Sequence, residues 1–187
     1  MNHLGTVELN TPRLILRRFR QGDAEQMFRN YTGDPEVTRF LTWPTHTSVE
    51  GTQGYLDMAL KEYDSEKTYR WAIVFEGEVI GCIDVVRLHE RSERCEIGYC
   101  MGKKWWNRGI MTEALDAVMD FLFNRADVYH ITAYHATDNP ASGRVMRKCG
   151  MKYQGTLRAM EKVGDTFHDC AYYSILRDEY QNRETEN

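Results

Sequence analysis

The segment Trp105-Trp-Asn-Arg-Gly-Ile-Met-Thr-Glu-Ala-Leu115 carries the clearest structural signal in the chain. Gly109 stands where a strand-like segment has ended and where residues 110–122 begin to repeat apolar side chains at helical spacing. Free N–H groups and the dipole at a helix N-terminus favour an anion, and glycine lets the backbone come close to it. The preceding loop adds positive charge through Lys103, Lys104 and Arg108. The segment predicts a diphosphate-binding turn; the alternative is an ordinary glycine helix start beside a solvated loop.

Strand and helix patterns extend on both sides of this turn. Strands are expected at 13–19, 69–75, 79–86, 95–101, 128–135, 151–157 and 168–176. Helices are expected from Asp23 to Tyr31, as a short segment from Asp34, and over 48–63, 109–123 and 138–150. The order β-α-α-β-β-β-α-β-α-β-β predicts one α/β domain over residues 1–187, with 182–187 as a frayed tail.

The composition is that of an ordinary globular protein. The chain has 187 residues, of which 42% are apolar, and its formal net charge is −4. This charge argues against binding nucleic acid through a broad basic face and weakly favours a cationic substrate. No apolar run approaches the ~20 residues that span a bilayer, and the N-terminus shows no signal-peptide pattern. We therefore expect a cytoplasmic protein with no membrane or nucleic-acid partner.

The cysteines and histidines form no metal-binding pattern. The five cysteines are odd in number and include no Cys-x-x-Cys pair, so reduced thiols are expected in place of disulfides or a zinc site. The six histidines lack paired spacing with acidic or thiol partners. His168-Asp169 is expected to shape a pocket and not to chelate. No metal is therefore predicted.

A second motif follows the strand at 128–135. The segment Thr137-Asp-Asn-Pro-Ala-Ser-Gly-Arg-Val-Met-Arg-Lys-Cys-Gly-Met151 opens a helix, with Asn139 as N-cap and proline after it. Together with Glu96-Ile-Gly-Tyr99 and the Gly109 turn, it resembles the acyl-CoA motifs of the GNAT (Gcn5-related) N-acetyltransferase superfamily, over nearly the whole chain. The resemblance implies a mixed, mostly antiparallel sheet of about seven strands flanked by helices, and an enzyme that uses acetyl-CoA.

The resemblance also implies which residues hold acetyl-CoA. Asn139 would hydrogen-bond the pantetheine arm, and Arg144 or Lys148 would meet the adenosine phosphates. Backbone N–H groups near Tyr99 and Cys100 would bind the oxyanion. The other expected members of the cofactor site are Met101, Trp106, Asn107, Arg108, Gly109, Ile110, Met111, Thr112 and Ser142.

Two of these residues depart from the general motif Gln/Arg-x-x-Gly-x-Gly/Ala. Trp106 holds its first position and Met111 its last. The larger side chain at 111 puts the closeness of the diphosphate to the backbone in question. Both departures are familiar in the subgroup that acetylates the N-termini of ribosomal proteins.

Acetyl transfer needs a group that takes a proton from the attacking amine and one that protonates the departing thiolate. By the resemblance, Ser142 is the expected acid, and Glu161, in a loop expected over 158–167, is the expected base. Glu96 is the competing base, on the strand before the cofactor loop. Each glutamate has a structural alternative, Glu96 as the partner of a cross-strand Arg or Lys and Glu161 as a solvated charge beside Lys162. A water chain without a single base is the third possibility.

The expected acceptor is the N-terminal α-amine of a protein or peptide, such as a ribosomal protein. A small amine, of the polyamine or aminoglycoside-like kind, is the alternative substrate, and a non-catalytic acyl-CoA-binding module is the alternative class. Regions 31–64 and 158–167 are expected to form the acceptor side. A homodimer is also expected, because exposed hairpin edges and the Trp43-Pro44 region offer surface for one.

Overall fold

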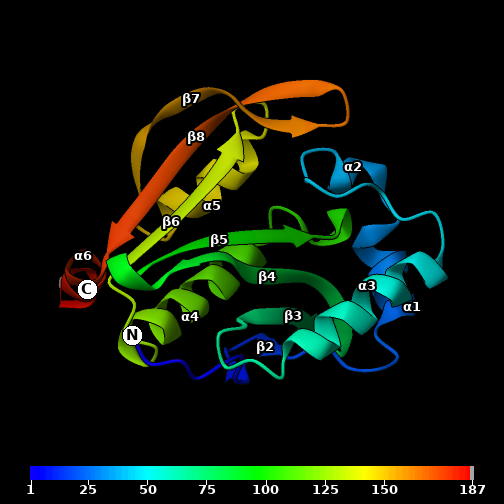
Figure 1. The fold of residues 1–187 in the computed structure, drawn as a ribbon, viewed down its shortest axis with the longest axis horizontal. Coiled ribbons are helices and arrows are strands. Elements are labelled where there is room, and N and C mark those ends of the chain that lie inside the picture. The colour runs from blue at the N-terminus through cyan, green and yellow to red at the C-terminus, as the bar shows by residue number, and fades with distance from the viewer. Residues whose placement is uncertain (186–187) are drawn as a thin grey trace.

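One mixed sheet organises the molecule, as seen in a computed structural model that describes residues 1–185 (Figure 1). Its eight strands lie in the order β1-β2-β3-β4-β5-β6-β8-β7. They are β1 (Leu9–Asn10), β2 (Leu14–Arg17), β3 (Arg70–Phe75), β4 (Glu78–His89), β5 (Arg94–Met101), β6 (His130–Ala136), β7 (Lys152–Val163) and β8 (Thr166–Leu176). Every neighbouring pair is antiparallel except β5 and β6, which are parallel. The predicted mostly antiparallel sheet is confirmed, with the short strand β1 as an addition.

Helices flank this sheet, and apolar spacing and capping residues predicted all of them except the last. They are α1 (Ala24–Met27), which continues as a π-helical turn over Phe28–Thr32, α2 (Pro35–Thr38), α3 (Val49–Glu62), α4 (Ile110–Asn124), α5 (Pro140–Lys148) and α6 (Arg177–Thr185). Ser48 Oγ caps α3 by accepting from Gly51 N at 3.3 Å. Asp23 stands at the N-cap of α1 as predicted, but its carboxylate binds the guanidinium of Arg17 at 2.8 and 3.0 Å instead of capping.

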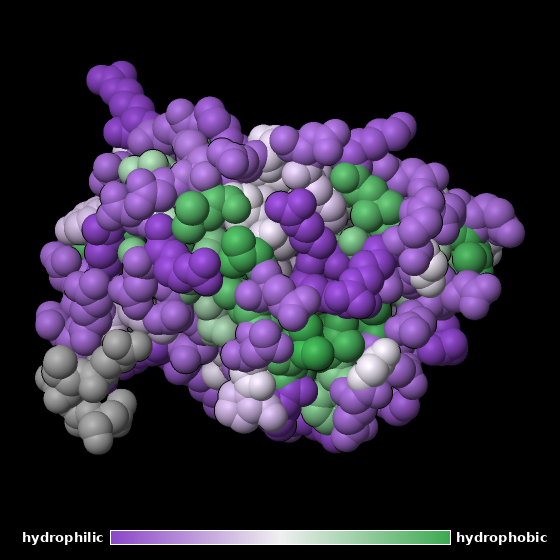
Figure 2. All heavy atoms as spheres, turned by 90° about the horizontal axis from the view of Figure 1, so that it is seen from below, coloured by the Kyte–Doolittle hydropathy of each residue, from purple (hydrophilic) through white to green (hydrophobic). Residues whose placement is uncertain are grey.

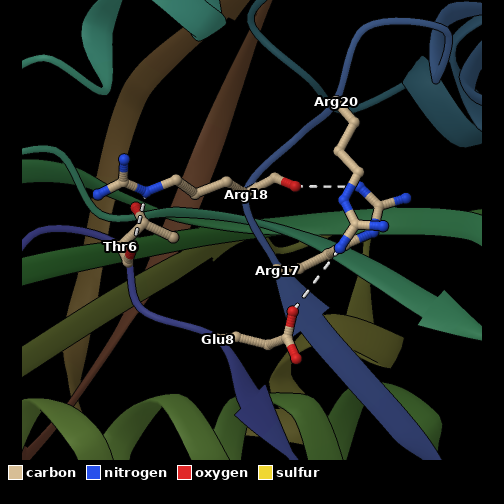
Figure 3. Close-up of a pocket in the computed structure, with 5 residues that line it drawn as sticks. All are labelled: Thr6, Glu8, Arg17, Arg18 and Arg20. Carbon is tan, nitrogen blue, oxygen red and sulfur yellow. Dashed lines mark hydrogen bonds and ion pairs between the residues drawn. The ribbon is translucent and has the colours of Figure 1, made fainter.

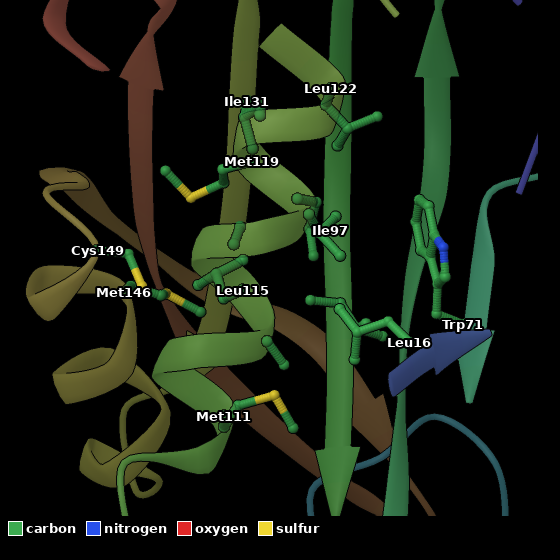
Figure 4. Packing of buried hydrophobic residues seen from close by; sticks show 14 of the residues in the cluster. Leu16, Trp71, Ile97, Met111, Leu115, Met119, Leu122, Ile131, Met146 and Cys149 are labelled. Carbon is green, nitrogen blue, oxygen red and sulfur yellow. The ribbon is translucent and has the colours of Figure 1, made fainter. Parts of the chain in front are cut away.

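The core lies on both faces of the sheet because strand residues alternate between them. On β3, Trp71 and Ile73 join a cluster with α4, while Ala72 and Val74 join a second cluster with α1 and α3. Figure 4 shows side chains of α4 pointing at β5. Leu115 of α4 is fully buried there, so its truncation to alanine would cost about 2–5 kcal/mol. The dense packing fixes α4, and therefore the turn that precedes it, against the central strands.

The surface seen from below in Figure 2 is mostly hydrophilic, with apolar groups gathered near its middle. Isolated apolar side chains on a protein surface are normal, and Ile15 of β2, at 42% exposure, is an example. Within residues 1–185, no helix is long and apolar enough to cross a membrane.

Two predictions about the C-terminal part were wrong. The loop expected over 158–167 is instead the end of a long hairpin, in which β7 and β8 continue to Val163 and from Thr166. Alternation is hard to see there because both faces of β7 are largely exposed. The frayed tail expected over 182–187 is helical as far as Thr185, and Arg183 binds Asp116 at 2.5 Å. Residues 186–187 of that prediction lie outside the described part of the chain.

Candidate active site

The candidate site opens where β5 and β6 part. Their pairing is limited to three positions and ends at Glu96 opposite Thr132. Beyond that point β5 pairs only with β4, and β6 only with β8. Figure 1 shows the two strands diverging. The edge of β5 after Glu96 therefore has no strand partner, and Tyr99 and Cys100, whose N–H groups were expected to bind the oxyanion, lie on this segment.

The turn before α4 is shaped by backbone conformation and by one tryptophan. Asn107 and Gly109 both have left-handed backbones, with φ of 58° and 72°, a region that glycine enters without strain. Trp106 Nε1 donates to Met101 O at 2.7 Å, which ties the turn to the end of β5. Trp106 therefore has a structural role at the position where the general motif has Gln or Arg.

Met111 does not obstruct the turn. Its side chain is buried in the core with Ile110. The first N–H groups of a helix have no intrahelical acceptor, so those of the first turn of α4 remain available for an anion. The large side chain of Met111 therefore does not keep a diphosphate away from the backbone of the turn, because it points into the protein.

Arg13 braces this turn, a role that was not recognised from the sequence. Its Nη1 donates to Arg108 O at 3.1 Å and its Nε to Glu113 Oε2 at 2.6 Å. Thr11 Oγ1 donates to Glu113 Oε1 at 2.6 Å. Burial would raise the pKa of Glu113, but these hydrogen bonds outweigh it and the pKa is lowered. The Thr11-Pro-Arg motif could have indicated this role, because Glu113 in the first turn of α4 is a carboxylate to which a basic side chain can bind.

A groove of about 670 Å³ runs between α4 and α5. It brings together three residues expected to bind cofactor, Gly109, Thr112 and Lys148. Arg144 and Lys148 are both exposed on α5. At the far end Arg183 donates to Cys149 O at 2.8 Å. The groove thus joins the turn before α4 to the basic side chain of Lys148, and the carboxylates of Glu113 and Asp116 also line it.

A second hollow, shown in Figure 3, is lined by a cluster of three arginines with structural partners. Arg17 binds Asp23, Arg18 Nε donates to Thr6 O at 2.8 Å, and Arg20 pairs with Glu8 at 3.8 Å. Because each guanidinium already has a protein partner, this hollow is a weaker candidate for an anion site than the α4–α5 groove.

The first turn of α5 places Ser142 against β5. Ser142 Oγ donates to Tyr99 Oη at 3.0 Å, and Tyr99 Oη donates to Ser142 O at 3.0 Å. Asn139 stands at the N-cap position as predicted, but its side chain makes no capping hydrogen bond. Its amide is therefore not occupied by capping the helix.

Glu161 lies on strand β7 and not in a loop. It is half-buried opposite His168, and its Oε2 accepts from Tyr134 Oη at 2.6 Å. Tyr134 in turn stacks on Tyr172 with ring centroids 5.0 Å apart. The carboxylate is thereby held by β6, and the interpretation of Glu161 as a solvated charge beside Lys162 does not fit the structure.

Glu96 is the second carboxylate at the opening. Its pairing with a cross-strand arginine, the structural alternative, is present, with Arg87 Nη1 at 3.8 Å from Oε1. Burial raises the pKa of Glu96 and the nearby charge of Glu161 adds to this effect, while Arg87 opposes it. A raised carboxyl pKa suits a general base, so Glu96 retains both interpretations.

One of the two regions expected to form the acceptor side, 31–64, contacts β8 one residue after the other region, 158–167. The ring of Phe40, from the segment after α2, contacts His168 of β8 edge to face at 5.9 Å. Beneath α1 and α3, the sheet carries Asp84, which pairs with Arg70 at 3.4 Å and whose pKa burial raises to about 6. Asp84 could not be recognised from the sequence, because a carboxylate on a solvent-exposed strand face produces the same sequence pattern.

Metal-ligand sets and disulfides do not occur in the part of the chain described here. Among residues 1–185, no three His, Cys, Asp or Glu side chains are grouped to hold a metal ion. The five cysteines are all buried as free thiols. His168 Nδ1 lies 3.7 Å from Asp138 Oδ2, a contact at the rim of the opening.

Comparison with known proteins identifies this architecture. Residues 13–152 match the family model described as an acetyltransferase (GNAT) domain. The chain belongs to the GNAT acetyltransferase family. The matched range contains the phosphate-binding turn and Ser142, but it ends at the start of β7, before Glu161.

Similar GNAT proteins come from several bacteria. The uncharacterized N-acetyltransferase YoaA of Bacillus subtilis is 32% identical over 171 residues, which cover 90% of this chain and 96% of YoaA. The [ribosomal protein uS5]-alanine N-acetyltransferase of Escherichia coli is 28% identical over 159 residues, 80% of each chain. The structure of RimL, a ribosomal L7/L12 α-N-protein acetyltransferase in complex with coenzyme A, has the same fold, with a TM-score of 0.84 at 20% identity over 92% of this chain and 99% of RimL.

Proposed function

We propose that this GNAT enzyme transfers the acetyl group of acetyl-CoA to the N-terminal α-amine of a protein or peptide. The observation that carries the proposal is that each of two candidate catalytic side chains is hydrogen-bonded to one of the two strands that part, β5 and β6. Ser142 of α5 donates to Tyr99 of β5, and Glu161 of β7 accepts from Tyr134 of β6. The similarity to the uS5-alanine N-acetyltransferase supports a protein N-terminus as the acceptor.

Acetyl-CoA would bind along the unpaired edge of β5 and the N-terminus of α4. The diphosphate would face the N–H groups of the first turn of α4, where the helix dipole favours an anion. Asn139 would bind the pantetheine arm, and Arg144 and Lys148 the adenosine phosphates. The remaining contacts would come from the segment between β5 and α4: Tyr99, Cys100, Met101, Trp106, Asn107, Arg108, Gly109, Ile110, Met111 and Thr112.

Transfer would proceed by direct attack in a ternary complex. Glu161 takes a proton from the ammonium, and the neutral amine attacks the thioester carbonyl. The backbone N–H of Tyr99 points to the open edge of β5 and would stabilise the oxyanion of the tetrahedral intermediate. The N–H of Cys100 points to β4 instead, because successive N–H groups of a strand alternate in direction. When the intermediate collapses, the C–S bond breaks and Ser142 gives its proton to the thiolate.

An α-amine suits a site whose two candidate bases are the carboxylates of Glu161 and Glu96. With a pKa of ~7.8, roughly a third of such an amine is neutral at pH 7.5, against ~0.1% of a lysine side chain. A base of ordinary strength is therefore sufficient to deprotonate an N-terminal amine. A lysine side chain or a polyamine would need far more help.

Mass spectrometry tests the proposed acceptor. The protein is incubated with acetyl-CoA and ribosomal proteins or lysate, and acetylated peptides are mapped; a parallel panel contains alanine- and serine-initiated peptides, spermidine and butylamine. The proposal predicts acetylation at protein N-termini and thiol release with the peptides. Acetylation of the small amines alone would refute it and would favour the small-amine alternative.

The expected homodimer and the expected cytoplasmic location remain predictions. Exposed apolar side chains of the β7–β8 hairpin offer surface for a partner copy, with Phe167 exposed by 62% and Tyr153 by 57%. Light scattering at micromolar concentration should give twice the mass of one chain. A monomer mass would exclude the dimer.

A further inference from the structure

Tyr99 and Ser142 make a reciprocal pair of hydrogen bonds. Tyr99 Oη accepts a hydrogen bond from Ser142 Oγ at 3.0 Å and donates one to the backbone carbonyl of Ser142 at 3.0 Å. Tyr99 belongs to β5 and Ser142 to α5, 43 residues further along the chain. The pair therefore ties α5 to β5, the strand along whose open edge the thioester is expected to bind.

Ser142 is also held from its other side. A side chain at the adjacent Gly143 would approach His135 Nε2 to 2.4 Å, so α5 packs on the His135 ring of β6 too closely to admit a side chain at that position. This close packing holds the first turn of α5 on β6, and the hydrogen bonds with Tyr99 restrain Ser142 on the side of β5.

The phenol of Tyr99 is suited to a constant role. Burial raises its pKa, and the hydrogen bond with Ser142 opposes this only in part. Tyr99 therefore remains neutral at the pH values where an acetyltransferase works, and it keeps a proton to donate.

We propose that Tyr99 is a positioning residue that orients the Ser142 hydroxyl for protonation of the departing thiolate. The inference rests on the acid role proposed for Ser142. As the C–S bond breaks, the Ser142 O–H bond breaks and an S–H bond forms. The Tyr99 hydroxyl rotates, so that it donates to Ser142 Oγ instead of the Ser142 carbonyl, which lies at the same distance. This hydrogen bond stabilises Ser142 Oγ as it loses its proton. Water then reprotonates Ser142, and Glu161 releases the amine proton to water.

A double-mutant cycle tests this inference. Tyr99→Phe keeps the ring and removes the hydroxyl; Ser142→Ala and the double variant complete the cycle. The acceptor is the member of the amine panel that gives the fastest thiol release with the unmodified protein. Tyr99→Phe should lower kcat about tenfold and leave the KM for acetyl-CoA within about twofold, because loss of one hydrogen bond is worth roughly 1.4 kcal/mol. In the Ser142→Ala background the same change should have almost no effect. Tyr153→Phe, at an exposed tyrosine of β7, is the matched control.

Each contrary outcome has its own meaning. Wild-type kcat in Tyr99→Phe, or an equal loss with and without the Ser142 hydroxyl, would overturn the positioning role while the acid role of Ser142 stands. Wild-type kcat in Ser142→Ala would overturn both. Thermal unfolding of each variant within a few degrees of the wild type separates these results from a loss of folding.

Discussion

The proposed cofactor side and the proposed acceptor side of the opening hold their functional groups in different ways. On the cofactor side, one continuous segment ends β5, makes the Gly109 turn and begins α4. The acceptor side combines strands β6, β7 and β8 with the segment after α2, whose Phe40 meets His168 from the other end of the sequence. The first side works mainly through backbone N–H groups and the second through side chains.

This difference separates the two sides in their response to mutation. Side chains of the turn can vary as long as the backbone keeps its conformation. Trp106 and Met111 illustrate this, because each differs from the general motif and each helps to hold the backbone in place. A backbone site fails only when its shape or charge changes. The acceptor side depends on single hydroxyl and carboxyl groups, so changes of one atom should alter catalysis without altering cofactor affinity.

The largest effect is expected for Gly109→Glu. The new carboxylate would stand at the N-terminus of α4 with a left-handed backbone, next to the diphosphate. We expect acetyl-CoA affinity to fall at least about 100-fold in calorimetry, because bulk and negative charge replace an anion site. Gly77→Glu, also at positive φ but with open space around it, is the control and should bind normally. Equal loss in both variants would mean that backbone strain, not the anion site, is responsible.

A smaller effect is expected for Tyr134→Phe on the acceptor side. The substitution removes the hydrogen bond to Glu161 Oε2 and leaves the stacking on Tyr172 in place. We expect kcat to fall about tenfold, the lower end for a hydrogen bond to a charged group, with acetyl-CoA affinity unchanged. Tyr129→Phe, before β6, serves as the control in the same steady-state assay. An affinity change as large as the kcat change would contradict the separation of the two sides.

The smallest effect concerns stability and not catalysis. Burial raises the pKa of Asp84 from 3.8 to about 6, although Arg70 pairs with it. A raised folded-state pKa adds stability below the unfolded pKa, and this contribution is lost as the pH rises through about 6. Between pH 7.5 and pH 5, the wild type should therefore gain about 1.4 kcal/mol over Asp84→Asn. Urea unfolding at both pH values checks this, with Asp64→Asn, at an exposed site, as control. A difference that does not change with pH would show that Asp84 is solvated.

Much of the cofactor side could be predicted from the sequence because its signals are local. Gly109 follows a basic loop and precedes an apolar repeat, and these features lie within a few residues of one another. The same holds for the β3–β4 hairpin, which the Glu76-Gly77-Glu78 turn predicted and which the structure confirms. Short-range patterns of this kind fix backbone conformation, which is what the cofactor side uses.

The acceptor side could be predicted only in part, because its contacts join distant residues. Nothing near Glu161 in the sequence indicates that Tyr134 holds it, or that β7 extends so far with both faces exposed. Likewise, the brace from Arg13 to Glu113 spans 100 residues. Such partners emerge only when the sheet brings separate strands together.

The central claim is that Glu161, on the far hairpin, takes the proton from the acceptor amine. The most direct measurement is kcat, and the pH profile of kcat/KM, for Glu161→Gln and Glu96→Gln with the same acceptor. We predict that Glu161→Gln lowers kcat at least ~30-fold, as expected for loss of a general base, while Glu96→Gln has little effect. A base must be ionised, so under the rival assignment the activity of the wild type falls when the pH drops below the pKa of Glu96. Burial raises this pKa above the ~4.3 of an ordinary glutamate. The rival assignment therefore predicts that this acid-side fall in activity is absent in Glu96→Gln. Wild-type rate and profile in Glu161→Gln would contradict the account.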